Sequence, residues 1–378
     1  MTSLPNFVAL YAAMYAAYGV ASPFLPAFVN ERGIAPEQLG LVLAAGTAIR
    51  LIAAPVAARI GDLSQALRPV LVLCIAFAAL VTFAYVPAQG FPAFLLLTLL
   101  HAAFLAPMTV LADALALGSS KRERFEYGRV RGAGSAAFIA GTLLSGQLVG
   151  GFGLEAIIWS QAALLAVAAI TGFFVPEFAH EPPAAAARKP AAGLALLLRI
   201  PLFRNLVIVA ALVLGSHAMH DAFAVIRWSA AGVSASSASL LWSLAVAAEV
   251  VVFFIVGPRL IARLTPAGAI ALAALCGVAR WAVMAHTTDL VALALVQPLH
   301  GVTFALLHLA CMRLIARTVP PGLEGSAQAI YATVGIGSAT ALLTFVSGHL
   351  YSRIGAEGFW VMAALCAAAL PLTLKLRT

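Results

Sequence analysis

Stretches of about 20 apolar residues recur from one end of this sequence to the other, with few residues between them. A helix needs a run of roughly 20 residues to cross the hydrocarbon core of a bilayer. Hydrophobic residues make up 63% of the 378 and charged residues only 10%, a balance that no soluble core of this length could hide from water. The sequence therefore predicts an all-α membrane protein with no room for a soluble domain.

The hydrophobic pattern predicts twelve transmembrane helices. The first apolar segment is about 25 residues long and lacks a convincing cleavage site, so we expect it to be a retained span and not a signal peptide. The predicted spans are 5–29, 38–60, 69–87, 92–117, 128–150, 155–175, 203–227, 237–257, 267–286, 290–314, 327–350 and 357–374.

One long polar interruption, from Pro176 to Arg204, contains the sequence EPPAAAARKP and divides the spans six and six. We interpret it as a linker, which gives an N-terminal bundle at 1–176, a cytoplasmic linker at 177–202 and a C-terminal bundle at 203–378. The loops after spans two and eight both carry Arg and a helix-breaking residue. Two pseudo-symmetric six-helix bundles around a central pathway are a transporter plan.

Lys and Arg collect in the cytoplasmic loops of membrane proteins, and here they lie almost entirely on one side of the predicted topology. Both termini are therefore expected in the cytoplasm, with the chain in the bacterial inner membrane. Topology and anionic lipid account for the net charge of +8, so it does not predict a nucleic-acid partner. The opposite side is flanked only by Arg32, Arg227 and Arg353.

Polar side chains inside membrane spans usually face the protein interior or a water-filled cavity. In this chain they form stripes at helical spacing on spans one, four, seven and ten, which are the first helices of successive three-helix units. Simple helix packing is the alternative for any one stripe. We take these stripes as candidate substrate contacts: Tyr11, Tyr15 and Tyr18; Thr109 and Asp113; His217, His220, Asp221 and Trp228; Gln297, His300, Phe304 and His308.

Three carboxylates lie within spans, and each is a functional candidate by its position: Asp113, Asp221 and Glu249. Glu249 has no charged neighbour within a turn, and such a carboxyl can take up and release a proton. A structural hydrogen bond to another helix is the alternative. We favour Arg280 as its partner, whereas Arg50, near the middle of span two, fits either an anionic substrate or Glu249.

The histidines are candidate proton relays, because imidazole titrates near neutral pH. Metal binding is the rival interpretation, but no pair shows a strong metal-ligand spacing, so we expect no metal. Nor does the chain carry a nucleotide-binding motif, a nucleophile elbow or a zinc signature. We therefore expect no enzyme and no cofactor, with an ion gradient as the energy source and the proton as the coupling ion.

The full pattern resembles the major facilitator superfamily over essentially the whole chain. Within it, the chain is most similar to the proton-coupled branch that holds lactose permease, nucleoside symporters and 3-phenylpropionate transporters. The superfamily's loop motif between spans two and three is partly kept in ARIGDLSQALR, where the resemblance implies gating roles for Asp62 and Arg68. The stretches that carry the likeness are GVASPFLPAF, FEYGRVR, GSHAMHDAF, LLWSLAVAAEVVVF, LHGVTFALLHLA and YSRIG.

The resemblance to lactose permease also implies individual roles. Asp113 and Arg131 match a carboxylate and arginine that pair at its substrate, although ordinary cytoplasmic charge is the alternative for Arg131. Thr303 stands where the permease has its proton-carrying carboxylate, and Phe138 where it has a sugar-stacking Trp, so galactoside specificity is not implied. The matches to its span-eight carboxylate, span-nine arginine and span-ten histidine are Glu249, Arg280 and His300.

These observations together predict a proton-coupled symporter that imports a small organic solute by alternating access. An aromatic acid such as 3-phenylpropionate is preferred on resemblance, with Arg50 or Arg131 as the partner of its carboxylate. Nucleoside or sugar symport, an exporter or antiporter of the same fold, and a membrane enzyme or receptor that moves nothing are the alternatives. The family resemblance implies a monomer.

Overall fold

The computed structural model describes residues 3–177 and 190–376, and the described residues are almost entirely helical, with no strand among them. Contacts within the chain divide it into two units. Unit 1 comprises Met1–Ala185 with Ser234–Leu240, and unit 2 comprises Ala186–Val233 with Leu241–Thr378. We describe each unit by itself.

The first six spans form unit 1, and the first of them is broken. It consists of α1 (Leu4–Ala21) and α2 (Leu25–Glu31), which are separated by a turn containing Pro23. The other spans are α3 (Pro36–Ser64), α4 (Leu67–Ala84), α5 (Gly90–Glu123), α6 (Tyr127–Phe152) and α7 (Glu155–Gly172).

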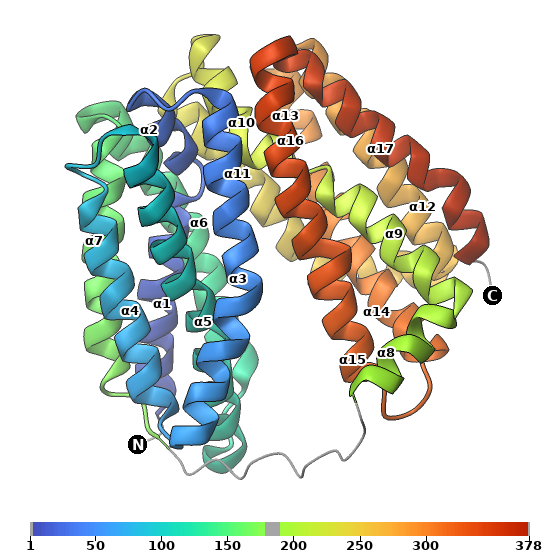
Figure 1. Cartoon of the computed structure of the whole chain (residues 1–378), viewed down its shortest axis with the longest axis horizontal. Coiled ribbons are helices and arrows are strands. Elements are labelled where there is room, and N and C mark those ends of the chain that lie inside the picture. Colours follow the sequence, from blue (N-terminus) through green and yellow to red (C-terminus); the bar gives the residue numbers. More distant parts are fainter. Residues whose placement is uncertain (1–2, 178–189, 377–378) are drawn as a thin grey trace. The chain divides into compact units, whose positions relative to one another are not determined.

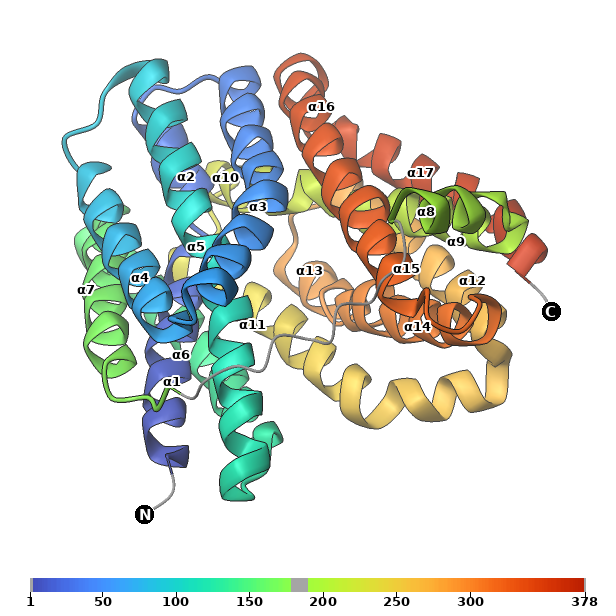
Figure 2. The ribbon, with the colours of Figure 1, turned by 60° about the horizontal axis from the view of Figure 1, so that its bottom comes forward.

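Helix α1 lies in the middle of unit 1, packed against α6 and α7, while α5 packs against α3 and α4 (Figures 1 and 2). Glycines permit the closest of these approaches. A Cβ at Gly19 would overlap the carbonyl oxygen of Phe138, and one at Gly141 would lie 2.5 Å from that of Ala16. The backbones of α1 and α6 therefore touch where no larger residue fits.

Unit 2 is built from helices that are interrupted more often. Its first span is broken between α9 (Pro201–Gly215) and α10 (Ala218–Ala230), in the same position as the break between α1 and α2. Helix α11 (Ala235–Val251) is shared, because its residues up to Leu240 belong to unit 1 and the rest to unit 2. The remaining helices are α12 (Gly257–His286), α13 (Leu290–Val296), α14 (Leu307–Thr318), α15 (Glu324–Ile330), α16 (Ala339–Ile354) and α17 (Gly358–Thr373).

Three π-helical segments continue these helices, and two of them adjoin residues of predicted function. Segment η2 (Gly301–Leu306) begins directly after His300, and η1 (Val252–Val256) begins three residues after Glu249. The third, η3 (Tyr331–Ser338), joins α15 to α16. Single π-turns inside α-helices are frequent at functional sites.

The described residues contain 10 apolar helical segments that could cross a membrane, and two of these are long enough for two spans. Ala235–His286 has 52 residues and would be about 78 Å long as one straight helix, far more than a bilayer core. It breaks at Thr265, where φ is 65°; Glu324–Leu376 breaks at Gly355, where φ is 55°. Each segment is two spans, and the prediction of a twelve-helix all-α membrane protein is confirmed.

The linker predicted at 177–202 lies partly outside the described residues, since 178–189 are among those not described. Its remainder contains a helix that the sequence analysis did not predict, α8 (Pro190–Arg199), which packs against α9 and α15. Leu197 of α8 is fully buried. Burial of this apolar side chain explains why a short segment beside a Pro-rich stretch is helical.

Candidate functional site

A carboxylate on α5 forms the centre of a polar cluster in unit 1. Tyr127 donates a hydrogen bond of 2.6 Å from its hydroxyl to Asp113 Oδ1, and the hydroxyl of Tyr11 donates to the same oxygen. One guanidinium nitrogen of Arg131 lies 3.9 Å from that oxygen. Helices α1, α5 and α6 thus meet at a carboxylate that accepts hydrogen bonds from two phenols and lies close to one arginine.

The tyrosine stripe of α1 lies against this cluster, as its spacing predicts. Tyr15 stacks on Tyr11 with ring centroids 5.8 Å apart and meets Tyr18 edge-on at 5.5 Å. The guanidinium of Arg131 lies over the Tyr15 ring, 5.1 Å from its centroid, and donates a hydrogen bond to the Tyr15 hydroxyl. The stripe is therefore both a packing surface and a hydrogen-bonding surface.

Two predicted substrate residues of unit 1 stand apart from the Asp113 cluster. Arg50 is exposed and, within the described part of the chain, makes neither an ion pair nor a hydrogen bond. Phe138 is half-buried, and its ring meets no other aromatic ring among the described residues. The structure thus leaves Arg50 as an unpaired cation in the middle of α3.

Arg280 on α12 is the centre of the polar cluster in unit 2. Its side chain is fully buried. One terminal nitrogen lies 3.1 Å from His300 Nδ1, and the other lies 2.9 Å from Gln297 Oε1 and 3.4 Å from His220 Nε2. The guanidinium also lies 4.6 Å from the ring centroid of Trp281. Residues from α10, α12 and the α13–η2 segment therefore converge on a single cation.

Arg280 determines which nitrogen carries the proton in two histidines. A guanidinium only donates, so His300 Nδ1 and His220 Nε2 must accept. The opposite nitrogen of each neutral ring then carries the proton. His300 Nε2 donates to Glu249 Oε2 at 3.3 Å, and His220 Nδ1 donates to Asp221 Oδ1 at 3.1 Å. Two chains run from one arginine through a histidine to a carboxylate.

The predicted direct pairing of Arg280 with Glu249 is wrong. No ion pair joins them in the described residues, because the imidazole of His300 lies between the two groups and bonds to both. The π-helical turn that follows His300 belongs to the same span as this ring. Glu249 and His300 are partly exposed, at 31% and 17% of their side-chain surface, so this end of the chain is accessible.

The hydrogen-bonding groups of His217 are used within unit 2. Its Nδ1 donates to the carbonyl oxygen of Leu214 at 3.1 Å, and its Nε2 lies 2.9 Å from the hydroxyl of Thr303. Thr303, which stands where lactose permease has a carboxylate, is thus bonded to a buried histidine. Trp228 is fully buried with its ring edge toward His220, 5.8 Å between centroids, and its Nε1 has no partner in the described residues.

Three aromatic residues of the clusters were not predicted. Tyr127 lies one turn before Arg131 in FEYGRVR, and that spacing was a usable signal. Trp242 stacks on His220 at 5.0 Å, and Trp281 donates from Nε1 to Ser216 Oγ at 2.8 Å. Neither tryptophan lies on one of the polar stripes of spans one, four, seven and ten, so the stripe pattern does not include them.

The predicted gating residues do not bond to each other. The guanidinium of Arg68 lies 3.7 Å from Glu177 and donates to the carbonyl oxygen of Val175 at 3.4 Å, so it joins the start of α4 to the chain after α7. Asp62 is exposed and makes no ion pair in the described part of the chain. Among the described residues, no three His, Cys, Asp or Glu side chains are grouped as a metal site would require.

Twelve membrane spans, with polar side chains clustered within the helices of each unit, are the plan of a polytopic membrane transporter. A sequence model described as the MFS_1 like family matches residues 4–362, and the chain belongs to this family of the major facilitator superfamily. The predicted family is therefore confirmed.

The relatives are similar over nearly their whole length. The chain is 35% identical over 376 residues to the "Probable 3-phenylpropionic acid transporter" of Escherichia coli (strain K12), covering 97% of this chain and 96% of the relative. It is 24% identical over 361 residues to the "Maltose permease" of Geobacillus stearothermophilus, covering 95% and 91%.

A solved structure shares the fold at low sequence identity. The crystal structure of a mutant of nucleoside transporter NupG superimposes with a TM-score of 0.86 at 15% identity, covering 99% of each chain. Because these relatives and neighbours are transporters, the chain is a transporter of small molecules and not an enzyme.

Proposed function

We propose that this chain is a proton-coupled symporter of the bacterial inner membrane, which imports a small aromatic carboxylate such as 3-phenylpropionate by alternating access. The 35% identical relative, whose name includes 3-phenylpropionic acid, supports this substrate class. We expect no cofactor, and the proton is the coupling ion. Its orientation, with both termini in the cytoplasm, follows from the distribution of Lys and Arg.

The chain from Arg280 through His300 to Glu249 is the observation that carries the proposal of proton coupling. A carboxyl group at membrane depth is costly and is a functional candidate by default. Glu249 has no cation in direct contact in the described residues, and the only charged or polar group bonded to it is the neutral ring of His300. Because no cation in contact with it holds the carboxylate in its ionised form, Glu249 can take up a proton.

The carboxylates, not the histidines, are the groups that carry the proton. Protonation of His300 would put an N–H on Nδ1, directly against the donating guanidinium of Arg280 at 3.1 Å. The same conflict would arise at His220 Nε2. Glu249 has no such neighbour, and it is more deeply covered than Asp221, which is 56% exposed. We therefore assign the proton to Glu249.

The substrate assignment also agrees with the composition of both clusters. The tyrosine stripe of α1 and the tryptophans around Arg280 provide flat apolar surfaces for an aromatic ring. The arginines provide partners for a carboxylate. A neutral sugar would make no use of this positive charge.

Uptake by purified protein in liposomes tests substrate and coupling together. Wild-type protein is expected to accumulate labelled 3-phenylpropionate when an inward proton gradient is applied. Glu249→Gln removes the titratable group but keeps a hydrogen-bond acceptor for His300. This variant is expected to lose accumulation and to retain counterflow, because exchange of substrate needs no net movement of protons.

Asp221→Asn is the matched control, because Asp221 ends the second chain from Arg280. It is expected to retain gradient-driven accumulation. Loss in Asp221→Asn with retention in Glu249→Gln would overturn the assignment to Glu249. Absence of uptake by the wild type under any gradient would overturn the substrate class, and accumulation only in inverted vesicles would overturn import.

A further inference from the structure

Arg50 is an isolated cation at the centre of a membrane span. It is the middle residue of α3, fourteen residues from either end of the 29-residue helix. Its side chain is exposed and makes no ion pair or hydrogen bond with the described residues. A charged side chain at this depth is costly and requires a partner. No carboxylate in the described part of the chain forms an ion pair with it, so the guanidinium is available to an anionic ligand.

The face of α3 that carries Arg50 lies on α5. A Cβ at Gly46 would meet the methyl of Thr98 at 2.8 Å and Ala102 at 3.7 Å, and one at Gly61 would meet Leu111 at 3.6 Å. The contacts run from Gly46 with Thr98 to Gly61 with Leu111, so residue numbers rise in the same direction along both helices, and α3 and α5 are parallel. Arg50 follows Gly46 by one turn on the same face, which puts it beside the turn of α5 that contains His101.

His101 provides a second unpartnered polar group at this place. The residue is only 4% exposed, and its Nε2 has no hydrogen-bond partner among the described residues. Buried polar atoms are nearly always bonded, so an orphan of this kind needs an explanation. Arg50 is close enough to interact electrostatically with His101 and also with Tyr18 and Tyr85.

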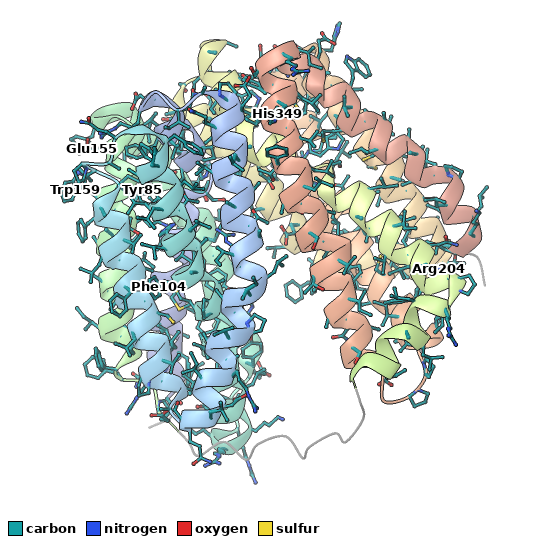
Figure 3. All side chains as sticks on the ribbon, viewed as in Figure 1. Tyr85, Phe104, Glu155, Trp159, Arg204 and His349 are labelled. Atoms are coloured by element: carbon teal, nitrogen blue, oxygen red, sulfur yellow. The ribbon has the colours of Figure 1, made fainter. Side chains whose placement is uncertain are left out.

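Neighbouring groups hold the His101 ring in a fixed position. Tyr85, at the end of α4, meets it edge-on with centroids 5.6 Å apart, and its hydroxyl bonds to that of Thr98 at 2.9 Å. Tyr18 donates a hydrogen bond of 3.4 Å to the carbonyl oxygen of Leu105, one turn further along α5. In Figure 3, Tyr85 lies near the end of unit 1 that also holds Glu155 and Trp159, and Phe104 of α5 lies nearer the middle.

Four other arginines in or beside the spans already have partners. Arg131 lies 3.9 Å from Asp113, and Arg32 forms an ion pair of 2.8 Å with Glu155. Arg280 donates to Gln297 and two histidines, and Arg227 donates to the carbonyl oxygen of Ala285 at 3.2 Å. An anion that binds at Arg131 or Arg32 would compete with an existing ion pair, whereas Arg50 makes no ion pair with the described residues.

We propose that Arg50 and His101 form a carboxylate-binding site in unit 1, where the guanidinium takes the substrate's carboxylate and His101 Nε2–H donates to it. This site deepens the proposed function and rests on the chain being a carboxylate transporter. The guanidinium fork matches the two oxygens of a carboxylate. Tyr18, which is only partly buried, provides aromatic surface beside the charge. Arg131 keeps its bond to Asp113 and does not receive the substrate's carboxylate.

Ligand-induced stabilisation of the purified protein tests the site without any proton gradient. A ligand that binds only the folded state raises the melting temperature, and the rise increases with the ratio of its concentration to its Kd. The probes are 3-phenylpropionate, its amide, and an aliphatic acid of similar length. Both acids are expected to stabilise the wild type, and the amide is not, because it lacks the charge that Arg50 binds.

Arg50→Gln is expected to weaken acid binding about tenfold or more, since a charge-assisted hydrogen-bonded pair is lost. Arg50→Lys keeps the charge without the fork and should weaken binding less. His101→Gln should weaken it moderately, and Arg259→Gln is the control that should leave acid binding near the wild-type level, because Arg259 is exposed and belongs to neither polar cluster. Each variant is used only when it elutes as a single folded species, and the Lys variant keeps the test valid when the Gln variant does not fold.

The outcomes distinguish failure of the Arg50–His101 site from failure of the proposed function. Proton-driven uptake with acid binding unchanged in Arg50→Gln and Arg50→Lys would overturn the Arg50 site and leave the transporter assignment standing. Binding of the aliphatic acid through Arg50 without binding of the aromatic acid would support the site and overturn the aromatic substrate. Stabilisation by the amide but by neither acid would overturn both.

Discussion

Arg280 shows how one buried side chain can organise a whole cluster. Its planar guanidinium presents donors in fixed directions, and here three acceptors occupy them: His300 Nδ1, His220 Nε2 and Gln297 Oε1. Each histidine is thereby kept neutral with its second nitrogen facing a carboxylate. The function of Arg280 depends on the geometry of its donors as well as on its positive charge.

Replacement of Arg280 by Lys should therefore abolish coupling even though the charge is kept. An ammonium group is a point donor and cannot hold both imidazoles in place. We expect Arg280→Lys to lose gradient-driven accumulation by about tenfold or more, the cost of one or two charge-assisted hydrogen bonds. Proton-driven uptake in liposomes measures the effect, and Arg259→Lys is the control, because Arg259 is exposed and donates to the carbonyl oxygen of Ile255, one turn before it. Full accumulation by Arg280→Lys would show that the planar guanidinium of Arg280 is not needed for coupling.

At the residue scale, sequence spacing predicted which side chains share one face of a helix, but not which residues they contact on other helices. The 0, 4, 7 spacing of Tyr11, Tyr15 and Tyr18 put their rings on one side of α1, where the structure has them. It could not predict that His300 lies between Arg280 and Glu249. Helical periodicity orders residues within one helix, whereas contact between helices also depends on crossing angle, depth and local irregularities such as η2.

At the scale of the elements, glycines distinguish close helix crossings from open surface. The sequence of α6 is rich in glycine throughout, but only some of these residues meet another helix. Gly141 lies against the backbone of α1, and Gly134 lies against the Tyr15 ring, where a Cβ would be 3.1 Å away. Gly132 has open space, because a Cβ there would meet no atom within 4 Å. Composition alone could not separate these cases.

Gly19→Ala and Gly141→Ala should each destabilise the protein, because the added methyl would meet backbone atoms that cannot rotate away. Overpacking of this kind costs about 1–3 kcal/mol, and a backbone contact is at the upper end. Gly132→Ala, on the same helix as Gly141, should be neutral or stabilising by about 0.5–1 kcal/mol through helix propensity. Unfolding of the purified proteins by denaturant measures the differences. Equal stability of Gly141→Ala and Gly132→Ala would contradict the close crossing of α1 and α6.

The elements of the fold were largely predictable, since each span is a long apolar run that has no other way to satisfy its backbone in lipid. The exceptions are local. The break at Ser216 and the helix α8 depend on packing that hydropathy does not encode. The break at Thr265, by contrast, lies directly before Pro266 in the loop predicted between spans 237–257 and 267–286.

At the scale of the whole molecule, charge determines how the chain is inserted. The basic residues at the α5–α6 end of unit 1, from Lys121 to Arg131, are opposed by a single arginine, Arg32, at the α2–α3 end, and Arg32 is neutralised by Glu155. Basic residues that flank spans are retained on the cytoplasmic side. The α5–α6 turn is therefore expected in the cytoplasm and the α2–α3 turn outside it.

Cysteine labelling in cells tests this orientation. The four native cysteines are buried or half-buried within spans, so background labelling by a membrane-impermeant maleimide should be low. Ala35→Cys, in the α2–α3 turn, should react in intact cells, and Lys121→Cys, at the end of α5, should react only after the membrane is permeabilised. Both positions are exposed, so a difference in reactivity reports the side of the membrane and not burial. The reverse pattern would show that the predicted orientation is wrong, with the α5–α6 turn outside the cytoplasm and the α2–α3 turn inside it.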